Sequence, residues 1–202
     1  MERTSGTDRR TNIVDAAIEI IASHGIKAMT HRAVDALLEL PTGSTSYYFR
    51  TRHALIDAIA HHIVATSRSD FEASGLTVSA GRDHENLARD IALSLDGTLA
   101  HRTQQLIART ALSIELPSDS PLHAALATSV FSRPNAVALF RALGTDDPET
   151  AAADFVSLCE GLIFDRVVGA RSLDGLRAGT DASIDQLAHA LDTYLRGALT
   201  RW

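Results

Sequence analysis

The side chains best suited to chemistry in this sequence lie in one short segment, residues 42–48, which reads TGSTSYY. Hydroxyl groups of Ser, Thr and Tyr can bind both phosphate oxygens and base edges, and a glycine allows close approach of the backbone. Arg50 and Arg52 follow at once and add positive charge. A segment of this composition suits a DNA groove, so we expect it to contact double-stranded DNA.

Two short helices separated by a turn are expected to position this segment. Thr30 can cap a helix in which Val34, Leu37 and Leu38 share one buried face. Pro41 has no N–H and biases the residue before it away from helical angles, so this helix should end there. The next helix then begins in the hydroxyl-rich segment, which is helix-turn-helix spacing. A plain helical hairpin in a bundle would share the helix-proline-helix pattern but not the other residues.

An earlier helix, ending at Gly25, is expected to support these two. Thr7 or Asp8 can cap its start, and Gly25 can end it in a left-handed conformation. Its apolar side chains recur at helical spacing and form one stripe, made of Ile13, Ala17, Ile20 and Ile21. This stripe can pack beneath the two short helices, with Met29 and Phe49 filling the remaining core.

The segment from Thr11 to Leu55 resembles the N-terminal DNA-binding domain of TetR-family transcriptional regulators. The residues in step with that family are Ile13, Ala16, Ala17, Gly25, Thr30, Val34, Gly43, Tyr47, Phe49 and Leu55. The resemblance implies an all-α, homodimeric, ligand-responsive transcriptional repressor. It would have an N-terminal three-helix DNA-binding domain and a larger C-terminal helical domain for ligand binding and dimerisation.

Three positions depart from the family pattern. Glu39 stands where many members have a turn glycine, Thr45 replaces a common leucine, and Ser46 replaces the first tyrosine of the recognition helix. A positive φ at Glu39 would store roughly 1–3 kcal/mol of strain. We expect these changes to affect base preference more than the fold.

The expected DNA contacts divide into those that select bases and those that hold the backbone. The candidates near bases are Thr42, Ser44, Thr45 and Tyr47, with Gly43 and Ser46 in the same segment. Phosphate contacts are expected from Thr30, Arg32, Tyr48 and Arg52, and also from Arg10, which the resemblance places near the DNA backbone. Two recognition helices in a dimer would enter major grooves about 34–36 Å apart, so the operator should be a near-palindrome.

Composition sets limits on this interpretation. The 202 residues carry a net charge of −6. Residues 1–69 have eight basic and seven acidic side chains, whereas residues 70–202 have eleven basic and eighteen acidic side chains. DNA binding would therefore rely on placed arginines rather than a generally basic field. The single cysteine, Cys159, rules out an internal disulfide, and neither a secretion signal nor a membrane span is evident, so we expect a soluble cytoplasmic protein.

We expect a DNA-binding domain over residues 1–51 and a C-terminal helical domain over residues 52–202. A helix over residues 52–71 should link the two domains, and residues 73–84 should form a connection. The further expected helices cover residues 86–100, 102–116, 121–143, 148–170 and 184–201. Pro134 should kink or split the third of these.

The last two helices are the expected surface for a second copy of the chain. Apolar residues repeat at helical spacing in both, and the candidates are Leu158, Leu162, Leu187, Leu191 and Leu195. Two such helices from each chain would make a four-helix interface. The alternative is that both stripes belong to the core of one chain, because periodicity does not say what covers a stripe.

A pocket for a small-molecule effector is implied by the resemblance alone. Polar or aromatic residues in otherwise apolar helices are candidates to line it, namely Arg109, Glu115, Phe131, Phe140 and Phe155. Each of them also fits core or surface, and an ion pair between Arg109 and Glu115 would be an equally simple account.

Motifs for catalysis and metal binding are lacking. The sequence has no GxGxxG, phosphate loop, HExxH, CxxC or GxSxG, and Cys159 lies in an apolar run. The acidic pair Asp146 and Asp147 precedes Pro148 and is more typical of a helix cap than of a cation site. We therefore expect neither an enzyme nor a cofactor or metal. A helical protein-interaction module without specific DNA binding is the alternative function.

Overall fold

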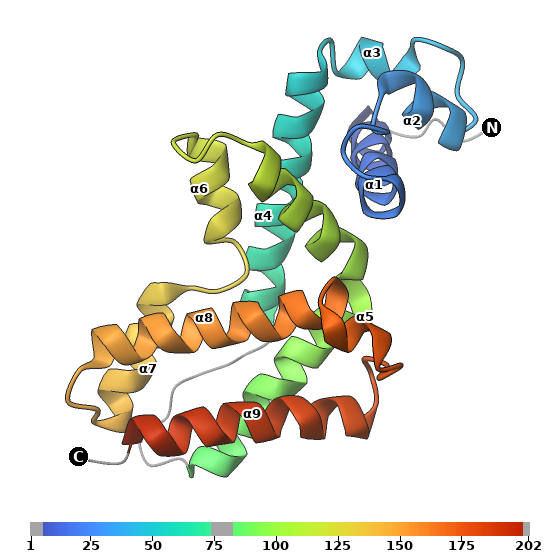
Figure 1. Cartoon of the computed structure of the whole chain (residues 1–202). Helices are drawn as coiled ribbons and strands as arrows, with labels where there is room; N and C mark the ends of the chain where they lie inside the picture. The colour runs from blue at the N-terminus through green and yellow to red at the C-terminus, as the bar shows by residue number, and fades with distance from the viewer. Residues whose placement is uncertain (1–5, 74–82, 200–202) are drawn as a thin grey trace. The chain divides into compact units, whose positions relative to one another are not determined.

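The computed structural model describes residues 6–73 and 83–199, and these residues form helices and connections with no strand (Figure 1). The expected all-α fold is confirmed. The elements are α1 (Gly6–His24), α2 (His31–Leu37), α3 (Ser44–Tyr48), α4 (Arg52–Ala73), α5 (His84–Glu115), α6 (Pro121–Ala127), α7 (Arg133–Leu143), α8 (Pro148–Val167), η1 (Ala170–Leu173) and α9 (Asp181–Leu199).

The described residues divide into two compact units. The first contains the chain up to Arg68 together with Gln104–Ser129, and the second contains Ser69–Thr103 together with the chain from Val130 onward. Consequently α4 and α5 each contribute to both units. Helix α5 has non-helical angles at Arg102, with φ −129° and ψ 18°, which is where the sequence predicts one helix to give way to another.

One apolar core fills the first unit. It includes the predicted stripe of α1 and the predicted fillers Met29 and Phe49, which are buried. Leu55, Ile59 and Ile63 from α4 lie in the same core, as do residues of α5 and α6. Helix α2 packs against both α1 and α3, so α2 joins the short α3 to the longer α1.

The turn after α2 has the hydrogen bonds of a Schellman motif. The Leu40 amide donates to the Asp35 carbonyl (2.8 Å) and the Glu39 amide donates to the Ala36 carbonyl (3.2 Å). Glu39 occupies the position of this motif that is usually glycine, and its φ is 53°. Among the described residues it is the only non-glycine with positive φ. The conformation expected at the family's turn glycine is therefore present.

Replacing Glu39 by glycine should raise the free energy of unfolding of the first unit by about 1 kcal/mol. The substitution removes a left-handed strain of about 1–2 kcal/mol, and the greater freedom of glycine in the unfolded chain offsets part of that gain. Urea denaturation followed by circular dichroism would measure the change. Glu39→Ala is the matched control, because alanine removes the charge and keeps the strain. Equal stabilisation by both substitutions would show that charge, not backbone strain, is the cause.

Helices α7, α8 and α9 build most of the second unit. Helix α7 packs against α8, and α8 and α9 lie side by side with opposite directions (Figure 1). Phe140, Phe155 and Tyr194 form an aromatic cluster with ring centroids 5.5–6.1 Å apart. The Tyr194 hydroxyl donates to the Ala151 carbonyl (2.7 Å), which joins α9 to α8.

The apolar stripe of α9 belongs to this core. Leu187, Leu191 and Leu195 are each 0% exposed within the single chain. The expectation that these three leucines contact a second copy is therefore wrong, because their side chains are already covered. Leu158 and Leu162 on α8 are only half-buried.

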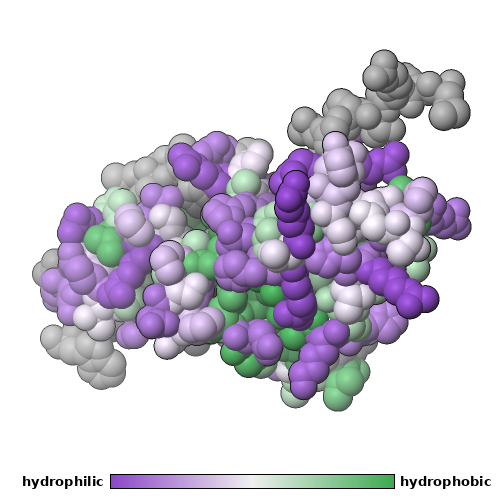
Figure 2. Space-filling view, turned by 90° about the horizontal axis from the view of Figure 1, so that it is seen from above, coloured by the Kyte–Doolittle hydropathy of each residue, from purple (hydrophilic) through white to green (hydrophobic). Residues whose placement is uncertain are grey.

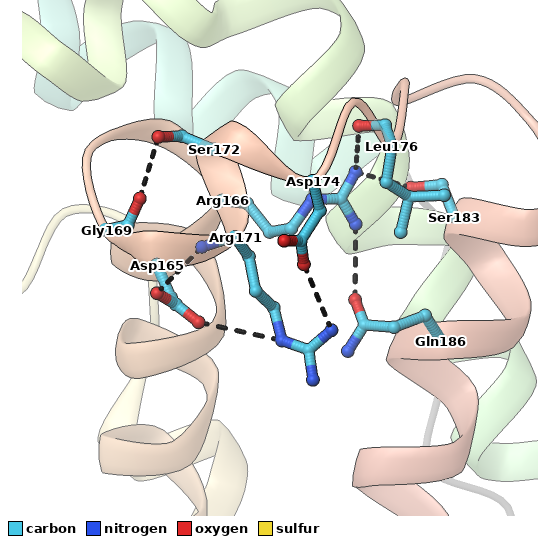
Figure 3. Close-up of polar contacts among 9 residues, drawn as sticks. All are labelled: Asp165, Arg166, Gly169, Arg171, Ser172, Asp174, Leu176, Ser183 and Gln186. Carbon is cyan, nitrogen blue, oxygen red and sulfur yellow. Dashed lines mark hydrogen bonds and ion pairs between the residues drawn. The ribbon is translucent and has the colours of Figure 1, made fainter.

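Helix α9 is also fastened by a buried arginine. The Arg166 guanidinium of α8 donates to three acceptors near the start of α9: the Leu176 carbonyl (3.1 Å), the Ser183 hydroxyl (2.9 Å) and the Gln186 side-chain oxygen (3.2 Å). Figure 3 shows these bonds converging on Arg166, whereas the nearby Arg171 makes ion pairs closer to the surface.

A buried carboxylate on α5 completes this network. Asp96 accepts from the Ser183 hydroxyl (2.5 Å) and from the Gly179 amide (2.7 Å), and its side chain is buried. Ser183 therefore links Asp96 to Arg166. Helices α5, α8 and α9 are thus joined by charged hydrogen bonds inside the second unit.

Some large apolar side chains remain on the surface. The exposed ones among the described residues are Leu37, Tyr47, Leu93, Ile114, Phe164, Val168 and Leu173. Figure 2 shows one face of the molecule, on which hydrophobic groups gather toward the lower edge and hydrophilic groups cover most of the rest. Within the described residues, every helix is too short or too polar to cross a membrane.

Candidate DNA-binding surface

Thr30 starts the helix-turn-helix segment as a helix cap. Its angles are extended, with φ −129° and ψ 155°, and its hydroxyl oxygen accepts from the Ala33 amide (3.1 Å). The cap that the sequence predicts is therefore present. A hydroxyl that accepts one hydrogen bond can still donate another, so capping is compatible with a phosphate contact from the exposed Thr30.

The join between α2 and α3 is made by Asp35. One carboxylate oxygen accepts from the Gly43 amide (2.8 Å), and the other accepts from both the Thr45 amide (2.7 Å) and the Thr45 hydroxyl (2.6 Å). The Asp35 side chain is 3% exposed. Burial alone would raise the pKa of this carboxyl, but the hydrogen bonds from Thr45 and Gly43 outweigh it and hold the pKa below its ordinary value.

Thr45 does not face outward. Its side chain is 0% exposed, and its hydroxyl donates to Asp35 beneath α3. The expectation that the Thr45 side chain contacts bases is therefore corrected. The physical reason is the carboxylate itself, which offers the hydroxyl a buried acceptor stronger than water.

The outward face of α3 and its turn carries the other candidates. Thr42, Gly43 and Ser46 are exposed, and Tyr47 is 81% exposed. The Tyr47 ring meets the half-buried Tyr48 edge-on, with centroids 5.2 Å apart at 87°. Ser44 is half-buried and donates its hydroxyl hydrogen to the Pro41 carbonyl (2.6 Å), so it can meet DNA only as an acceptor.

Two arginines assigned to phosphates also hold the unit together. Arg10 donates to the Tyr48 carbonyl (3.0 Å), and its guanidinium lies over the Phe49 ring at 4.5 Å from the centroid. Arg52 donates to the carbonyls of Ile26 (2.7 Å) and Met29 (3.4 Å). A guanidinium has five N–H donors, so both side chains retain donors that a phosphate can use. Arg32 lies on α2 and is exposed, as Arg10 and Arg52 are.

The sequence missed two of these arrangements. Asp35 follows the core residue Val34 and is itself buried. The only sign of its role in the sequence is a charged residue next to a core position. The Nε2 nitrogen of His31 lies 2.6 Å from the Phe49 carbonyl and donates to it, which ties α2 to the end of α3. Neither contact follows from spacing alone, because both depend on how the helices pack.

The five ligand-pocket candidates fall in two groups. Arg109 and Glu115 belong to the first unit, where Arg109 is buried and donates to the carbonyls at the end of α6, Leu126 (2.9 Å) and Ala127 (3.1 Å). The other three, Phe131, Phe140 and Phe155, belong to the second unit. Phe140 and Phe155 are core residues of the aromatic cluster. Phe131 is half-buried and lies in the connection that follows α6 in the sequence.

A separate cavity of about 650 Å³ opens in the second unit. It lies between the α7–α8 connection and the last turn of α9, and its lining includes Asp146, Asp147, Asp154, Leu143 and Tyr194. Three carboxylates beside an aromatic ring would favour a cationic ligand.

Two residues considered for other chemistry have structural roles. Asp147 caps α8, as the sequence predicts, and the hydrogen bond from Thr150 lowers the pKa of its carboxyl. Cys159 is a core residue, where burial, with a smaller effect of Glu160, raises the pKa of its thiol to about 12. A thiol with so high a pKa is not a nucleophile near neutral pH. The described residues contain no cluster of three His, Cys, Asp or Glu able to hold a metal ion.

The C-terminal part of the chain matches a known family. The family model described as "Tetracyclin repressor-like, C-terminal domain" matches residues 82–201, more than half of the sequence. A comparison with curated protein sequences finds no match.

Solved structures share the fold over almost the whole chain. A TetR-family transcriptional regulator from Streptomyces coelicolor has a TM-score of 0.72 at 16% identity, covering 96% of this chain and 97% of its own. A transcriptional regulator from Rhodococcus sp. Rha1 has a TM-score of 0.70 at 20% identity, covering 96% and 99%. The multidrug binding protein EbrR, complexed with malachite green, has a TM-score of 0.66 at 24% identity, covering 96% and 99%. At these identities the likenesses establish a common fold.

Proposed function

The chain belongs to the TetR family of transcriptional regulators, and on that premise we propose that it is a sequence-specific repressor that binds a near-palindromic operator as a homodimer. The observation that carries the proposal is the exposed face of α3, where Ser46 and Tyr47 point outward from a helix held on α2. The DNA-reading part is residues 1–51. Regulators of this family are in general not enzymes.

The proposed contacts follow the exposure of each side chain. Base contacts fall to the turn and the outward face of α3, with Gly43 allowing close approach, and the residues are Thr42, Ser44, Ser46 and Tyr47. Phosphate contacts fall to exposed or half-buried residues on α1, α2, α3 and α4, which are Arg10, Thr30, Arg32, Tyr48 and Arg52. Phosphate contacts fix the register of a protein on DNA, whereas base contacts select the sequence.

Fluorescence anisotropy tests this division. The probe is a duplex enriched from a randomised pool by the purified chain, compared with a shuffled duplex of the same length across a salt titration. We expect selective binding with two chains per duplex, and an affinity that falls linearly with salt on logarithmic axes. Equal binding of both duplexes would overturn the operator proposal.

Two variants separate backbone contacts from base contacts. Arg32→Ala should weaken both duplexes alike and flatten the salt slope by about one unit, whereas Tyr47→Ala should reduce the preference between them by about 1–3 kcal/mol. Arg32 serves better than Arg52, because Arg52 also binds two backbone carbonyls. Tyr47→Phe keeps the ring and isolates the hydroxyl. If the losses for Arg32→Ala and Tyr47→Ala were the same on both duplexes, the division would be refuted.

We propose the outer face of α8 as the surface that a second copy covers. Phe164 is 50% exposed and Val168 is 43% exposed, and Gly161 lies one turn before Phe164 on the same face. A Cβ built on Gly161 would meet nothing within 4 Å, so a partner helix has room to approach there. Leu158 and Leu162 flank this face and are half-buried. Contiguous exposed apolar patches, rather than single exposed apolar residues, are a feature of interfaces.

We further propose that a small cationic molecule is the effector. The likeness to EbrR, a multidrug binding protein complexed with malachite green, supports a small-molecule ligand. The acidic lining of the cavity in the second unit, with Asp154 beside Tyr194, supports a positive charge on it. In the anisotropy assay, an organic cation should release the selected duplex and a neutral molecule of similar size should not. Release by both or by neither would refute the proposed cation.

A further inference from the structure

Helix α3 lacks the means to hold its own start. It has five residues, its N-cap is Gly43 in the left-handed region at φ 95°, and no side chain of its own caps it. So short a helix is marginal by itself, because fixing the first turn costs more entropy than its few hydrogen bonds return. Its position must therefore be set by groups outside it.

Asp35 supplies the missing cap from another helix. The amides of Gly43 and Thr45 are groups that a helix start leaves without an intrahelical partner, and both donate to this one carboxylate of α2. The Thr45 hydroxyl adds a third bond. Because both oxygens of a buried carboxylate are engaged, α3 is fixed in direction as well as in distance from α2.

The Asp35 and Thr45 side chains work as a matched pair. The TetR resemblance places a common leucine at position 45, where this chain has a threonine whose hydroxyl is buried against the carboxylate. A buried carboxylate without donors would be costly, and so would a buried hydroxyl without an acceptor. Each residue therefore requires the other.

We infer that Asp35 is a positioning residue for DNA recognition, which orients α3 so that Ser46 and Tyr47 face the groove while its own side chain touches no DNA. The inference rests on the proposed function, since it assumes that α3 reads DNA. The inference goes beyond that function, because it assigns part of the sequence specificity to a buried carboxylate behind the DNA-reading face of α3.

Electrostatics makes the effect of removing this carboxylate distinctive. DNA is a polyanion, so deleting a negative charge from the DNA-binding unit should by itself strengthen binding to any duplex. A positioning role predicts the opposite for the selected duplex, because a tilted α3 loses its base contacts. A gain on shuffled DNA with a loss on selected DNA is a result that a general loss of folded protein does not give.

The experiment measures the ratio of affinities for the selected and shuffled duplexes in four variants. Asp35→Asn and Thr45→Val remove the charge and the hydroxyl with little change of shape. Asp15→Asn is the charge control, because Asp15 lies exposed on α1 and pairs with His62 (3.1 Å). The double variant Asp35→Ala/Thr45→Leu replaces the polar pair by an apolar one. All are compared under conditions where circular dichroism shows the variant to be folded.

We expect Asp35→Asn to lower the affinity ratio about tenfold or more, the equivalent of one lost good base contact. Thr45→Val should lower it less, Asp15→Asn should leave it unchanged, and the double variant should recover part of what Asp35→Asn loses. A ratio that stays at the wild-type value in folded Asp35→Asn would overturn the inference.

Amide hydrogen exchange keeps this test separate from the proposed function. In Asp35→Asn the amides of Gly43 and Thr45 should lose protection while those of the α1 core residues keep theirs. If the wild-type chain selected no duplex, the proposed function would fail, and the exchange result alone would decide the role of Asp35. Unchanged protection at both amides would then overturn it.

Discussion

Replacing Phe164 by glutamate should convert the proposed dimer to monomers and lower the affinity for the selected duplex by about 10²–10⁴-fold. The loss is this large because two linked recognition helices bind with an avidity that exceeds the affinity of one by that factor. Phe164 is 50% exposed in the single chain, so a charge there costs little unless a partner covers it. Sedimentation velocity would measure the oligomeric state, and anisotropy would measure the affinity.

Two control variants distinguish an interface effect from other causes. Ile114→Glu adds the same charge at an exposed apolar residue of the other unit, and it should leave the oligomeric state unchanged. Leu191→Ala should destabilise the fold by about 2–5 kcal/mol, because that side chain fills the core of its own chain. A Phe164→Glu variant that is still dimeric would show that the two copies meet at another surface.

The local structure of this chain was largely predictable, because single residues fix it. Gly25 follows the last residue of α1, Asp147 caps α8, and Pro134 lies in the first turn of α7 after the predicted break. Helix α2, predicted to end at Pro41, ends earlier at Leu37, because the turn at Glu39 stops it. Glu39 takes the positive φ that the family's turn glycine implies. In each case a residue acts on backbone atoms a few positions away, so both interacting groups can be read from one short stretch of sequence.

The partners of buried side chains were not predictable in the same way. The apolar spacing of α9 fits an interface or the core of one chain, because periodicity identifies a buried face without identifying what covers it. In the folded chain Leu191 is covered within its own chain. A hydroxyl in a recognition helix suggests an outward contact, so the sequence predicts Thr45 near bases. Its inward direction depends on Asp35, ten residues earlier, and that pairing exists only once α2 and α3 have packed.

Arg109 illustrates the same limit for the ligand site. A polar residue in an otherwise apolar helix is a candidate for the pocket that the resemblance implies, and an ion pair with Glu115 is an equally simple account. In the folded chain its guanidinium donates to the last carbonyls of α6, which a helix end leaves without partners. Sequence reasoning could identify the unusual residue, but it could not show that its partners are the carbonyls at the end of α6.

Replacing Arg166 by methionine should lower the free energy of unfolding of the second unit by about 3–5 kcal/mol, the range for removing one member of a buried charged network. Methionine keeps much of the apolar stem, so the loss comes from the Leu176 carbonyl, Gln186 and Ser183, which lose a charged donor. Asp96, joined to Arg166 through Ser183, would remain buried with less compensation. Urea denaturation with hydrogen exchange on α8 and α9 would measure the change in this unit.

The matched control for Arg166 lies five residues away. Arg171 makes its ion pairs with Asp165 (3.6 Å) and Asp174 (3.8 Å) near the surface, where such pairs contribute about 0–1 kcal/mol (Figure 3). Arg171→Met should therefore be nearly neutral, although it removes the same group. Equal losses in the two variants would show that charge number, not burial, stabilises this unit. Arg166→Met removes the bonds that hold the start of α9 on α8. We therefore expect it to loosen α8 as well, and with it the outer face that we propose a second copy covers.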